Sequence, residues 1–474
     1  MAEGKSVLLG LALAVATATA ALAYSPCEDA TLGAFDLANP LKSETALATL
    51  VCNAELATVS DDSAVITWVT NKTAPSKVEC WGLDGSDCSA ASDPGIYHAV
   101  EIAGLAPGTI YYYRIPTDGA PALPTLQSPG IFRTFDRPGD YLYSFASLND
   151  MHVGETVSGQ LTSLGGNPLP PSFTQSNPPY WKVMNEGAVA GIRSRAADFT
   201  IVKGDLTSDG TQTAQAAGLL SPLGQVFAIR GNHDKSLPGF LAGIYDPRGK
   251  PSTTSVNDHS TEADPHLDFS FASPSGGGDL FFVALDSWDN DMPLPPGLPL
   301  QSPSAVGGGR FTNDQLAWLD QELGRGKKTF VFLHHPVSEI ASVTAIPPVI
   351  FTVRQPDAAL FLQKIAAHSN VVGVLSGHTH RNWITPSLLA PGVPFVETAA
   401  AKEYPGGYTI YKVFTGGYLQ SFYKCTTPDC LAWSEKTRGE YFNLYPVYTS
   451  MTGARNGCFS YVFASRTLNI PEIQ

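Results

Sequence analysis

The stretch QVFAIRGNHD, residues 225–234, runs from a short apolar segment directly into a group of polar residues. The stretch FTIVKGD, residues 199–205, has the same pattern one element earlier. Short apolar runs of this kind are typical of buried strands in a parallel sheet, where strands alternate with helices. Because the carboxyl ends of parallel strands share one edge of the sheet, the polar residues that follow them are expected to meet there. The sequence therefore predicts an α/β protein with a polar site at the ends of its strands.

Five polar motifs follow predicted strands in this way. We expect strands at residues 141–148, 199–203, 225–229, 281–285, 329–333 and 371–375, and helices at residues 313–323 and 357–367. The first helix is preceded by Thr312 and has Gln315 three residues later, which is the pattern of a capping box. The five motifs are Asp150-Met151-His152, Gly204-Asp205, Gly231-Asn232-His233-Asp234, His334-His335-Pro336 and Gly377-His378-Thr379-His380.

The motifs supply carboxylate, imidazole and amide side chains. Side chains two residues apart in extended backbone point the same way, which pairs Asp150 with His152 and His378 with His380. This mixture of ligands suits Zn, Mn, Fe or Co better than Ca or Mg. A single Gly-Asp or His-His-Pro indicates little and is more often structural. All five motifs in one order, each after an apolar strand, indicate a site for two divalent metal ions.

The composition limits the class of partner. Hydrophobic residues make up 43% of the 474-residue chain and charged residues 15%, which is typical of a globular protein. The formal net charge of −14 argues against an extended nucleic acid as a partner, because phosphate backbones are bound by clustered Lys and Arg. A small phosphorylated substrate is compatible with this charge, since bound cations reverse the local field.

The amino-terminal residues have the pattern of an export signal. Lys5 precedes an apolar run at residues 7–21, and Ala21-Leu22-Ala23 matches a small-x-small cleavage site. A membrane anchor is the alternative, but the run is short and rich in alanine for a spanning helix. We expect a signal peptide at residues 1–23 and a secreted mature chain, periplasmic or extracellular, that begins with a segment at residues 24–46 and has no membrane contact.

Cysteine usage agrees with export. None of the seven cysteines has CxxC spacing, which makes a zinc finger or a redox motif a poor interpretation. Oxidised pairs outside the cytoplasm are the better interpretation, although the sequence does not define the connectivity. The cysteines fall into close pairs with one left over: Cys27 with Cys52, Cys80 with Cys88, Cys425 with Cys430, and Cys458.

Residues 47–136 have an all-β pattern. The run AVITWVT at residues 64–70 is rich in β-branched and aromatic residues, and the turn Pro107-Gly108 leads to Tyr111 in the next strand. A strand Trp and a Tyr just past such a turn suit a small β-sandwich in which the Tyr hydroxyl pins the corner. This region resembles the fibronectin type III domain in front of the catalytic domain of purple acid phosphatases. We interpret it as a packing and spacing module without chemistry.

The series of five motifs resembles that of the calcineurin-like metallophosphoesterase superfamily. The resemblance covers residues 141–414. It implies an α/β fold of four layers, two β-sheets flanked by helices, here preceded by the small all-β unit. Residues 415–474 carry no chemical motif and are expected to complete or cap the sheet as a β-rich extension.

The resemblance also implies a role for each motif residue. One metal ion would be bound by Asp150, His152 and His380. The second would be bound by Asn232, His334 and His378, with Asp205 bridging both ions. His233 would be the catalytic histidine, oriented by Asp234, and His335 would face the substrate or support the ligands from behind.

At two positions the chain departs from purple acid phosphatases, which carry Gly where this chain has His152 and Tyr where it has Ser208. Without that Tyr, no tyrosinate binds a ferric ion and no purple colour is expected. The catalytic region instead resembles the divalent-metal branch of the superfamily. That branch includes bacterial phosphodiesterases that act on cyclic nucleotides and glycerophosphodiesters.

The ligand set and the resemblance predict hydrolysis of a phosphodiester or a phosphomonoester. Two cations lower the pKa of a bridging water toward about 7, and the hydroxide attacks phosphorus while His233 donates a proton to the leaving group. A second class stays open, a non-catalytic extracellular binding protein with a vestigial metal fold. Intact Asp205, Asn232 and His233 argue against it, because a retired site usually loses its bridge or its acid.

Three long loops flank the predicted site, at residues 154–180, 235–268 and 288–310. They are rich in Gly, Pro and Ser, which is typical of binding loops. Four aromatic residues could stack on a base or ring, although ordinary packing is the commoner role: Tyr180, Trp181, Trp288 and Trp383.

Overall fold

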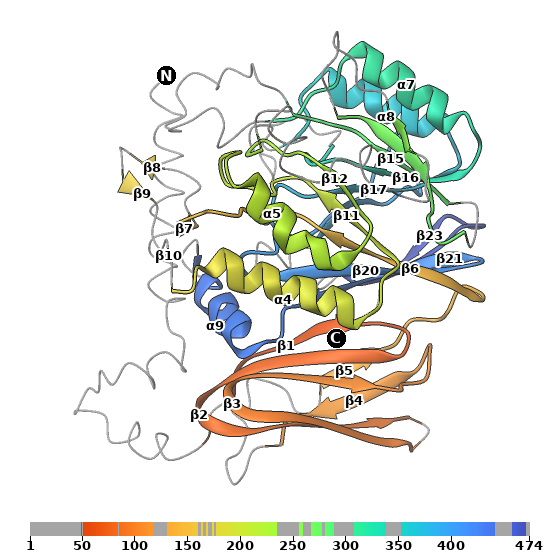
Figure 1. The fold of residues 1–474 in the computed structure, drawn as a ribbon. Coiled ribbons are helices and arrows are strands. Elements are labelled where there is room, and N and C mark those ends of the chain that lie inside the picture. Colours follow the sequence, from red (N-terminus) through yellow and green to blue (C-terminus); the bar gives the residue numbers. More distant parts are fainter. Residues whose placement is uncertain are drawn as a thin grey trace, which may run out of the picture.

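The structure is a computed structural model that describes residues 49, 51–83, 85–116, 130–159, 177–234, 267–276, 280–288, 308–337, 352–440 and 457–470, with a few short strands between them. The predicted signal peptide, Cys27 and most of the three predicted binding loops lie outside the described residues. A small all-β unit packs against a larger α/β unit (Figure 1).

The all-β unit is one antiparallel sheet in the order β1-β2-β4-β5, with β3 paired to β2. Register shifts interrupt the pairing of β2 with β3 around Ala74, yet Ile66 and Val78, which lie before and after this point on β2, belong to the same core. The sheet therefore folds over on itself instead of forming two separate sheets. Its strands are β1 (Val51–Val59), β2 (Ser63–Gly82), β3 (Asp87–Ala103), β4 (Ile110–Arg114) and β5 (Gly130–Arg133).

The corner predicted at Tyr111 is confirmed. Its hydroxyl accepts a hydrogen bond from the backbone N–H of Ala106 at 2.9 Å. Trp68 is buried and stacks on His98, with ring centroids 4.8 Å apart. A disulfide joins Cys80 to Cys88 across β2 and β3, so these two neighbouring cysteines form one of the expected oxidised pairs.

The first sheet of the α/β unit has seven strands in the order β12-β11-β6-β20-β21-β22-β23. β6, β11 and β12 run parallel, while β20 pairs antiparallel with β6 and continues into the strands of the carboxyl-terminal residues. The strands are β6 (Tyr141–Leu148), β11 (Phe199–Lys203), β12 (Val226–Ile229), β20 (Gly407–Phe414), β21 (Gly417–Lys424), β22 (Phe459–Val462) and β23 (Thr467–Asn469).

The second sheet also has seven strands, in the order β13-β14-β15-β16-β17-β19-β18, and β15, β16, β17 and β19 are parallel. Its strands are β13 (Val256–Asp258), β14 (Phe269–Ala272), β15 (Leu280–Ala284), β16 (Lys328–Phe332), β17 (Val371–Ser376), β18 (Trp383–Thr385) and β19 (Phe395–Glu397). Two short ribbons lie outside both sheets: β7 (Val157–Ser158) with β10 (Phe173–Thr174), and β8 (Ser163–Leu164) with β9 (Asn167–Pro168).

The two sheets pack face to face through aromatic side chains. Phe145 of β6 meets Phe282 of β15 and Phe330 of β16 edge to face, with ring centroids 5.2 and 5.6 Å apart. In Figure 1, α4 and α5 cover the outer side of the first sheet, and α7 and α8 cover that of the second. The helices are α4 (Tyr180–Ser194), α5 (Thr213–Leu220), the 3-10 turn η1 (Ser221–Leu223), α7 (Asn313–Leu323), α8 (Asp357–Ala367) and α9 (Pro428–Thr437). This is a mixed α/β fold of the predicted kind.

The boundaries of several elements agree with the sequence-based predictions. β6, β11, α7 and α8 have the predicted bounds, and β12, β15, β16 and β17 differ by one residue at one or both ends. Both hydrogen bonds of the predicted capping box are present at the start of α7. Gln315 N–H donates to Thr312 Oγ1 at 3.1 Å, and Thr312 N–H donates to Gln315 Oε1 at 2.9 Å. Among the described residues, no helix combines the length and the apolar composition that a membrane span requires.

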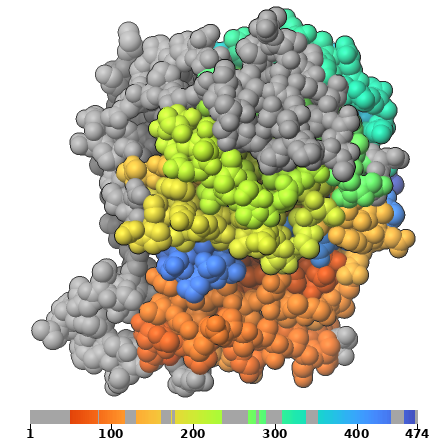
Figure 2. All heavy atoms as spheres, in the orientation of Figure 1, coloured from red at the N-terminus to blue at the C-terminus, as the bar shows by residue number. Residues whose placement is uncertain are grey.

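The all-β unit shares a core with the first sheet of the α/β unit. Leu419 of β21 and Cys458 are buried in the same cluster as Ile66 of the all-β unit. The thiol of Cys458 therefore takes the place of a small apolar side chain between the units. Cys52 is disulfide-bonded. Cys425 and Cys430 are free thiols that donate to the carbonyl oxygens of Met184 and Val183, so the expectation that these two cysteines form an oxidised pair is wrong. Figure 2 shows α9 between α4 and the all-β unit on one face of the molecule.

Candidate metal centre

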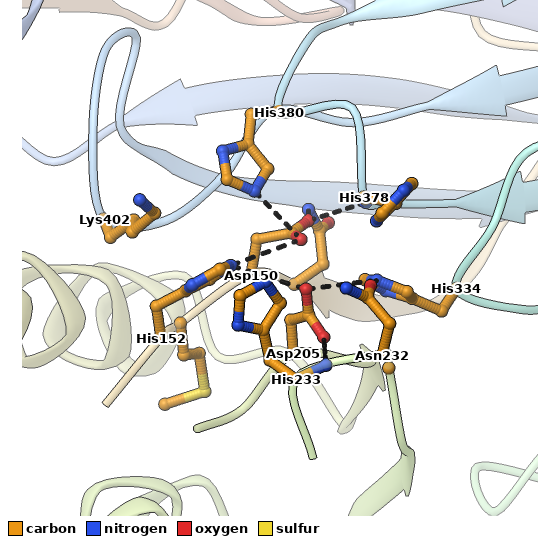
Figure 3. A network of polar contacts seen from close by, with 12 residues as sticks. Asp150, His152, Asp205, Asn232, His233, His334, His378, His380 and Lys402 are labelled. Atoms are coloured by element: carbon orange, nitrogen blue, oxygen red, sulfur yellow. Dashed lines mark hydrogen bonds and ion pairs between the residues drawn. The ribbon is translucent and has the colours of Figure 1, made fainter. Parts of the chain in front are cut away.

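The five motifs converge at one edge of the two facing sheets (Figure 3). Each motif follows the carboxyl end of a parallel strand, as predicted. The first sheet contributes Asp150 and His152 after β6, Asp205 after β11, and Asn232 and His233 after β12. The second sheet contributes His334 and His335 after β16, and His378 and His380 after β17.

One group of possible metal ligands consists of Asp150, His152 and His380, whose ligand atoms lie within 4.8 Å of one another. The Nε2 atoms of His380 and His152 lie 3.2 and 3.9 Å from Asp150 Oδ1. One strand of each sheet supplies this trio: Asp150 and His152 follow β6, and His380 follows β17. The trio is the one that the family resemblance implies for one metal ion.

A second group lies beside the first. His334 Nε2 is 3.0 Å from Asn232 Oδ1, and the rings of His334 and His378 are 4.9 Å apart. Asp205 lies between the groups, because its Oδ2 is 3.5 Å from His152 Nε2 and 3.2 Å from His334 Nε2. A single carboxylate thus reaches both groups, which is the position required of a bridging ligand.

The backbone at the site is in an unusual conformation. Asp150, His152, Asp205, His378 and His380 all have positive φ, between 43° and 68°. Non-glycine residues adopt this left-handed region at a cost of order 1–3 kcal/mol each, and such residues cluster at functional sites. The prediction that these segments are extended is therefore wrong.

This conformation also changes which histidines act together. His380 lies with Asp150, whereas His378 lies with His334 and His335. His378 and His380 therefore point into different groups, and the pairing expected from extended backbone does not apply to them. Asp150 and His152 do share a group, although they reach it from left-handed backbone.

Two motif glycines allow the close approach of ligand side chains. A Cβ on Gly204 would lie 2.6 Å from His334 Nδ1, and one on Gly377 would lie 2.7 Å from Asp150 Oδ2. No Cβ atom tolerates such distances, so a larger residue at either position would displace a ligand. The glycines of the motifs are required by this crowding.

The donor set fits two divalent cations. Oδ1 of Asp150 and Nε2 of His152 are buried, and neither makes a hydrogen bond to another described residue. Buried polar atoms without a hydrogen bond are costly unless another partner takes them. Carboxylates, imidazoles and one amide oxygen at this spacing are the ligands that borderline divalent metal ions prefer. The clusters support two divalent metal ions without defining their identity.

Asp150, Asp205 and His378 have the charge states that metal binding needs. Burial raises the pKa of Asp150, but His380 and other nearby histidines hold it well below its ordinary value of 3.8. Burial also raises the pKa of Asp205, and His334 is the largest influence that brings it well below 3.8. Burial and neighbouring histidines lower the pKa of His378 well below 6.5, so its ring is neutral. For His152, His334 and His380 burial lowers the pKa, but the neighbouring carboxylates raise it above 6.5, so these rings lose a proton when an ion binds.

His233 is oriented differently from the prediction. Its Nδ1 is 2.8 Å from the carbonyl oxygen of Ser208, and this contact fixes the ring. The carboxylate of Asp234 is engaged elsewhere: it accepts hydrogen bonds from the backbone N–H groups of Leu206, Thr207 and Gly231, and from the Thr207 hydroxyl. Asp234 therefore ties together the loops that follow β11 and β12, and the prediction that it orients His233 is wrong.

His335 is buried beside the second group. Its Nδ1 is 2.9 Å from the Ser287 hydroxyl, and its ring lies 4.6 Å from that of His378. It lies close enough to His334 and His378 to be grouped with them as a possible ligand. The structure thus places His335 among the possible ligands of the second group, which neither of its two predicted placements anticipated.

Tyr180 does not serve as a stacking platform for a substrate. It is buried, stacks on Trp433 at 4.2 Å, and donates its hydroxyl hydrogen to Glu155 Oε2.

Lys402 and Glu403, beside the site, were not predicted. They stand between Ala399-Ala400-Ala401 and Tyr404. An adjacent Lys and Glu among apolar residues is the sequence signal that could have indicated a buried ion pair.

The two facing sheets, with carboxylate and imidazole groups gathered at their common edge, place the chain in the class of α/β proteins with a candidate metal site between two sheets. A family model described as calcineurin-like phosphoesterase matches residues 144–382, just over half of the 474-residue chain. The chain belongs to the calcineurin-like phosphoesterase family.

Individual relatives share parts of the chain. A protein named probable cyclic nucleotide phosphodiesterase from Synechococcus sp. is 30% identical over 203 residues, which are 41% of this chain and 62% of the relative. The chain thus spans less than two thirds of that relative.

Two solved structures have a distant likeness. The first is a dimetal phosphatase from Danio rerio, with 15% identity, a TM-score of 0.44, and coverage of 59% of this chain and 96% of that one. The second is a purple acid phosphatase from yellow lupin, with 12% identity, a TM-score of 0.36, and coverage of 78% and 71%. At these values neither structure bears on the substrate.

Proposed function

We propose that the protein is a secreted phosphoesterase that hydrolyses phosphodiester or phosphomonoester bonds of a small substrate with two divalent metal ions. The observation that carries this proposal is the position of Asp205 Oδ2, within 3.5 Å of His152 Nε2 and 3.2 Å of His334 Nε2. One carboxylate between two groups of imidazoles is the arrangement that a two-metal site requires. The name of the Synechococcus relative favours a diester as the substrate.

The proposed ligands follow the two groups. Asp205 would be shared by both ions, and the cations would supply the Lewis acidity that activates water and neutralises charge on a phosphoryl group. The ligands of one ion are Asp150, His152 and His380, and those of the other are Asn232, His334 and His378.

His233 is the proposed proton donor to the leaving oxygen. Because Nδ1 is directed at the carbonyl oxygen of Ser208, the ring presents Nε2 to the rest of the site. Its centroid lies 4.5 Å from that of His152, so the ring borders the ligand groups. Because the Nδ1 hydrogen is donated to Ser208, Nε2 carries a proton only when the ring is an imidazolium, a form that burial disfavours by lowering the pKa of His233. In that form Nε2 is placed to give a proton to a leaving oxygen next to the metal ligands.

Export and the nature of the all-β unit are part of the proposal. The Cys80–Cys88 disulfide supports a chain that folds in an oxidising compartment. The hydrogen bond from Ala106 N–H to Tyr111 Oη supports a fibronectin III-like unit, because such domains have a Tyr at this corner. We assign this unit a role in packing rather than in chemistry.

The direct test is an assay of nitrophenyl phosphate and bis-nitrophenyl phosphate with Zn, Mn, Fe and Co in turn. A higher kcat/KM for the diester supports a phosphodiesterase, and the reverse result supports a phosphomonoesterase. If the metal-loaded protein hydrolyses neither ester, nor any alkyl ester, the non-catalytic binding protein becomes the better explanation.

A further inference from the structure

Two of the proposed ligand histidines have carboxylates behind them. His380 Nδ1 lies 2.6 Å from Glu403 Oε1, and His152 Nδ1 lies 3.3 Å from Glu155 Oε1. The opposite ring nitrogen, Nε2, faces Asp150 in His380, and in His152 it lies between Asp205 at 3.5 Å and Asp150 at 3.9 Å. The His380 ring is thus held between a hydrogen-bonded carboxylate, Glu403, and Asp150. The His152 ring has an ion-pair contact with Glu155, and its Nδ1 makes no hydrogen bond to another described residue.

Lys402 connects the two supporting carboxylates. Its Nζ lies 2.6 Å from Glu155 Oε2 and 2.9 Å from Glu403 Oε2, so each glutamate uses one oxygen for a histidine and the other for Lys402. The Lys402 side chain is only 3% exposed. Figure 3 shows Lys402 beside His152 and His380, away from the Asn232 and His334 side of the site.

The surrounding elements fix this arrangement. Trp433 of α9 donates its Nε1 hydrogen to the Lys402 carbonyl at 2.9 Å, and Tyr180 of α4 donates to Glu155 Oε2 at 2.6 Å. Ser158 Oγ is 2.8 Å from Glu403 Oε2. Because an isolated buried charge is strongly unfavourable, the lysine and the two glutamates are stable here only as a set.

The second group of ligands is supported in another way. His334 Nδ1 lies 2.8 Å from the backbone carbonyl of Lys203, which carries no net charge. A hydrogen bond from Nδ1 fixes the tautomer that leaves the Nε2 lone pair for a metal ion, and a carboxylate partner also makes the imidazole a stronger ligand. In the first group the supporting groups are charged side chains, which a mutation can remove. The group that supports His334 is a neutral backbone carbonyl, which a mutation cannot remove.

We propose that Lys402, Glu155 and Glu403 form a positioning cluster that orients His152 and His380 and thereby sets the metal affinity of the Asp150 site. This inference rests on the proposed two-metal site. Glu403 is the central member, because it makes the shorter contact to a histidine and also contacts Lys402. The cluster acts on the ligands and does not touch the reacting atoms.

The test is a titration of the metal-free protein with Mn²⁺, measured by isothermal titration calorimetry. Elemental analysis then gives the number of ions bound per chain. We expect the wild type to bind two ions. Glu403→Ala is expected to weaken one of the two by about 10–100-fold and to leave the other unchanged. Glu403→Gln is expected to lose less affinity, because its amide oxygen can still accept the hydrogen from His380 Nδ1.

The matched control is Glu440→Gln. Glu440 is buried and lies 2.7 Å from the same Ser158 hydroxyl, so this carboxylate contacts a serine of the cluster's surroundings and not a ligand histidine. Its substitution is expected to leave both affinities unchanged. Thermal melting of each metal-free variant then separates loss of positioning from loss of stability.

Two results would overturn the inference. One is that Glu403→Ala binds both ions with unchanged affinity. The other is that Glu403→Ala and Glu403→Gln each lose affinity for the two ions equally. If Glu403→Ala does not fold, Glu403→Gln and Glu155→Gln decide the question by the same criterion, the selective weakening of one ion. A wild-type protein that binds fewer than two ions would contradict the proposed function instead.

Discussion

His233 is held by a backbone carbonyl, that of Ser208, although the sequence placed a carboxylate next to it in Asp234. A carbonyl oxygen accepts a hydrogen from Nδ1 and directs Nε2 into the site, but it does not supply the negative charge of an Asp-His pair. His233 can therefore act as an acid only when its ring is doubly protonated, and the benefit of that proton depends on how much the leaving group needs it.

The leaving group therefore decides what His233→Ala does. An alkoxide is a poor leaving group, and hydrolysis of an alkyl phosphoester is expected to fall about 10²–10⁴-fold. Nitrophenolate leaves as an anion, so its ester is expected to lose far less, with both metal ions retained. The measurement is kcat/KM for one alkyl ester and one nitrophenyl ester, beside the metal content. Equal losses on both esters would exclude the acid role and leave His233 as a clamp or a structural residue.

The sequence could predict which residues the structure brings together at the strand ends, but not their conformation. The motif order brings Asp150, His152 and Asp205 together as expected. Their positive φ values have no marker in the sequence, because they are imposed by packing around the site. Lys402 and Glu403 also escaped prediction, since ion pairs between distant segments depend on the tertiary fold.

At the scale of elements, sequence patterns that act within one segment were sufficient to predict where a helix begins. The capping box at Thr312 and Gln315 fixes the first residue of α7, and both of its hydrogen bonds are present. Strand ends in the buried sheets shift by one residue, because hydrophobic runs do not define where a ladder stops. The continuous, folded-over sheet of the all-β unit depends on the register shifts around Ala74, which no local pattern indicates.

His98 makes the stability of the all-β unit dependent on pH. Its ring nitrogens lie 2.7 Å from the hydroxyls of Thr70 and Ser76, and burial lowers its pKa from 6.5 to about 4. Between these values the unfolded chain binds more protons than the folded one. The stabilisation is therefore complete above pH 6.5 and is lost as the pH falls toward 4, by roughly 3 kcal/mol in all.

Urea unfolding at several pH values checks this expectation. Carboxylates also titrate in this range, so wild type is compared with His98→Gln to isolate the contribution of His98. The difference in the free energy of unfolding between the two proteins should shrink as the pH is lowered from 7 to 4. A difference that is constant over this range would show that His98 is not linked to unfolding.

At the scale of the whole molecule, the two units are joined by a common core and by polar contacts. Arg195 of the α/β unit forms a bidentate ion pair with Glu101 of β3, with both N–O distances at 3.0 Å. Ser421 Oγ donates to the Val59 carbonyl at 2.9 Å, and Leu419 is buried among residues of the all-β unit. A core that crosses the boundary couples the unfolding of the two units.

Leu419→Ala tests this coupling. Removing a buried leucine side chain costs about 2–5 kcal/mol, and here the loss falls on both units. Thermal unfolding should remain a single transition at a lower Tm, by far-UV and near-UV circular dichroism alike. Leu388→Ala is the control, because Leu388 is 90% exposed and its loss should be within about 0.5 kcal/mol of neutral. Separate transitions for the two units in Leu419→Ala would contradict a shared core.

The central claim is that Asp205 bridges two catalytic metal ions, and elemental analysis of Asp205→Asn tests it most directly. Its Oδ2 is the carboxylate oxygen that approaches both His152 and His334. The wild type should contain close to two divalent ions per chain and hydrolyse phosphoesters. Asp205→Asn should lose at least one ion and its activity, while a wild-type circular dichroism spectrum shows that it is folded. An active Asp205→Asn protein with both ions bound would contradict the account.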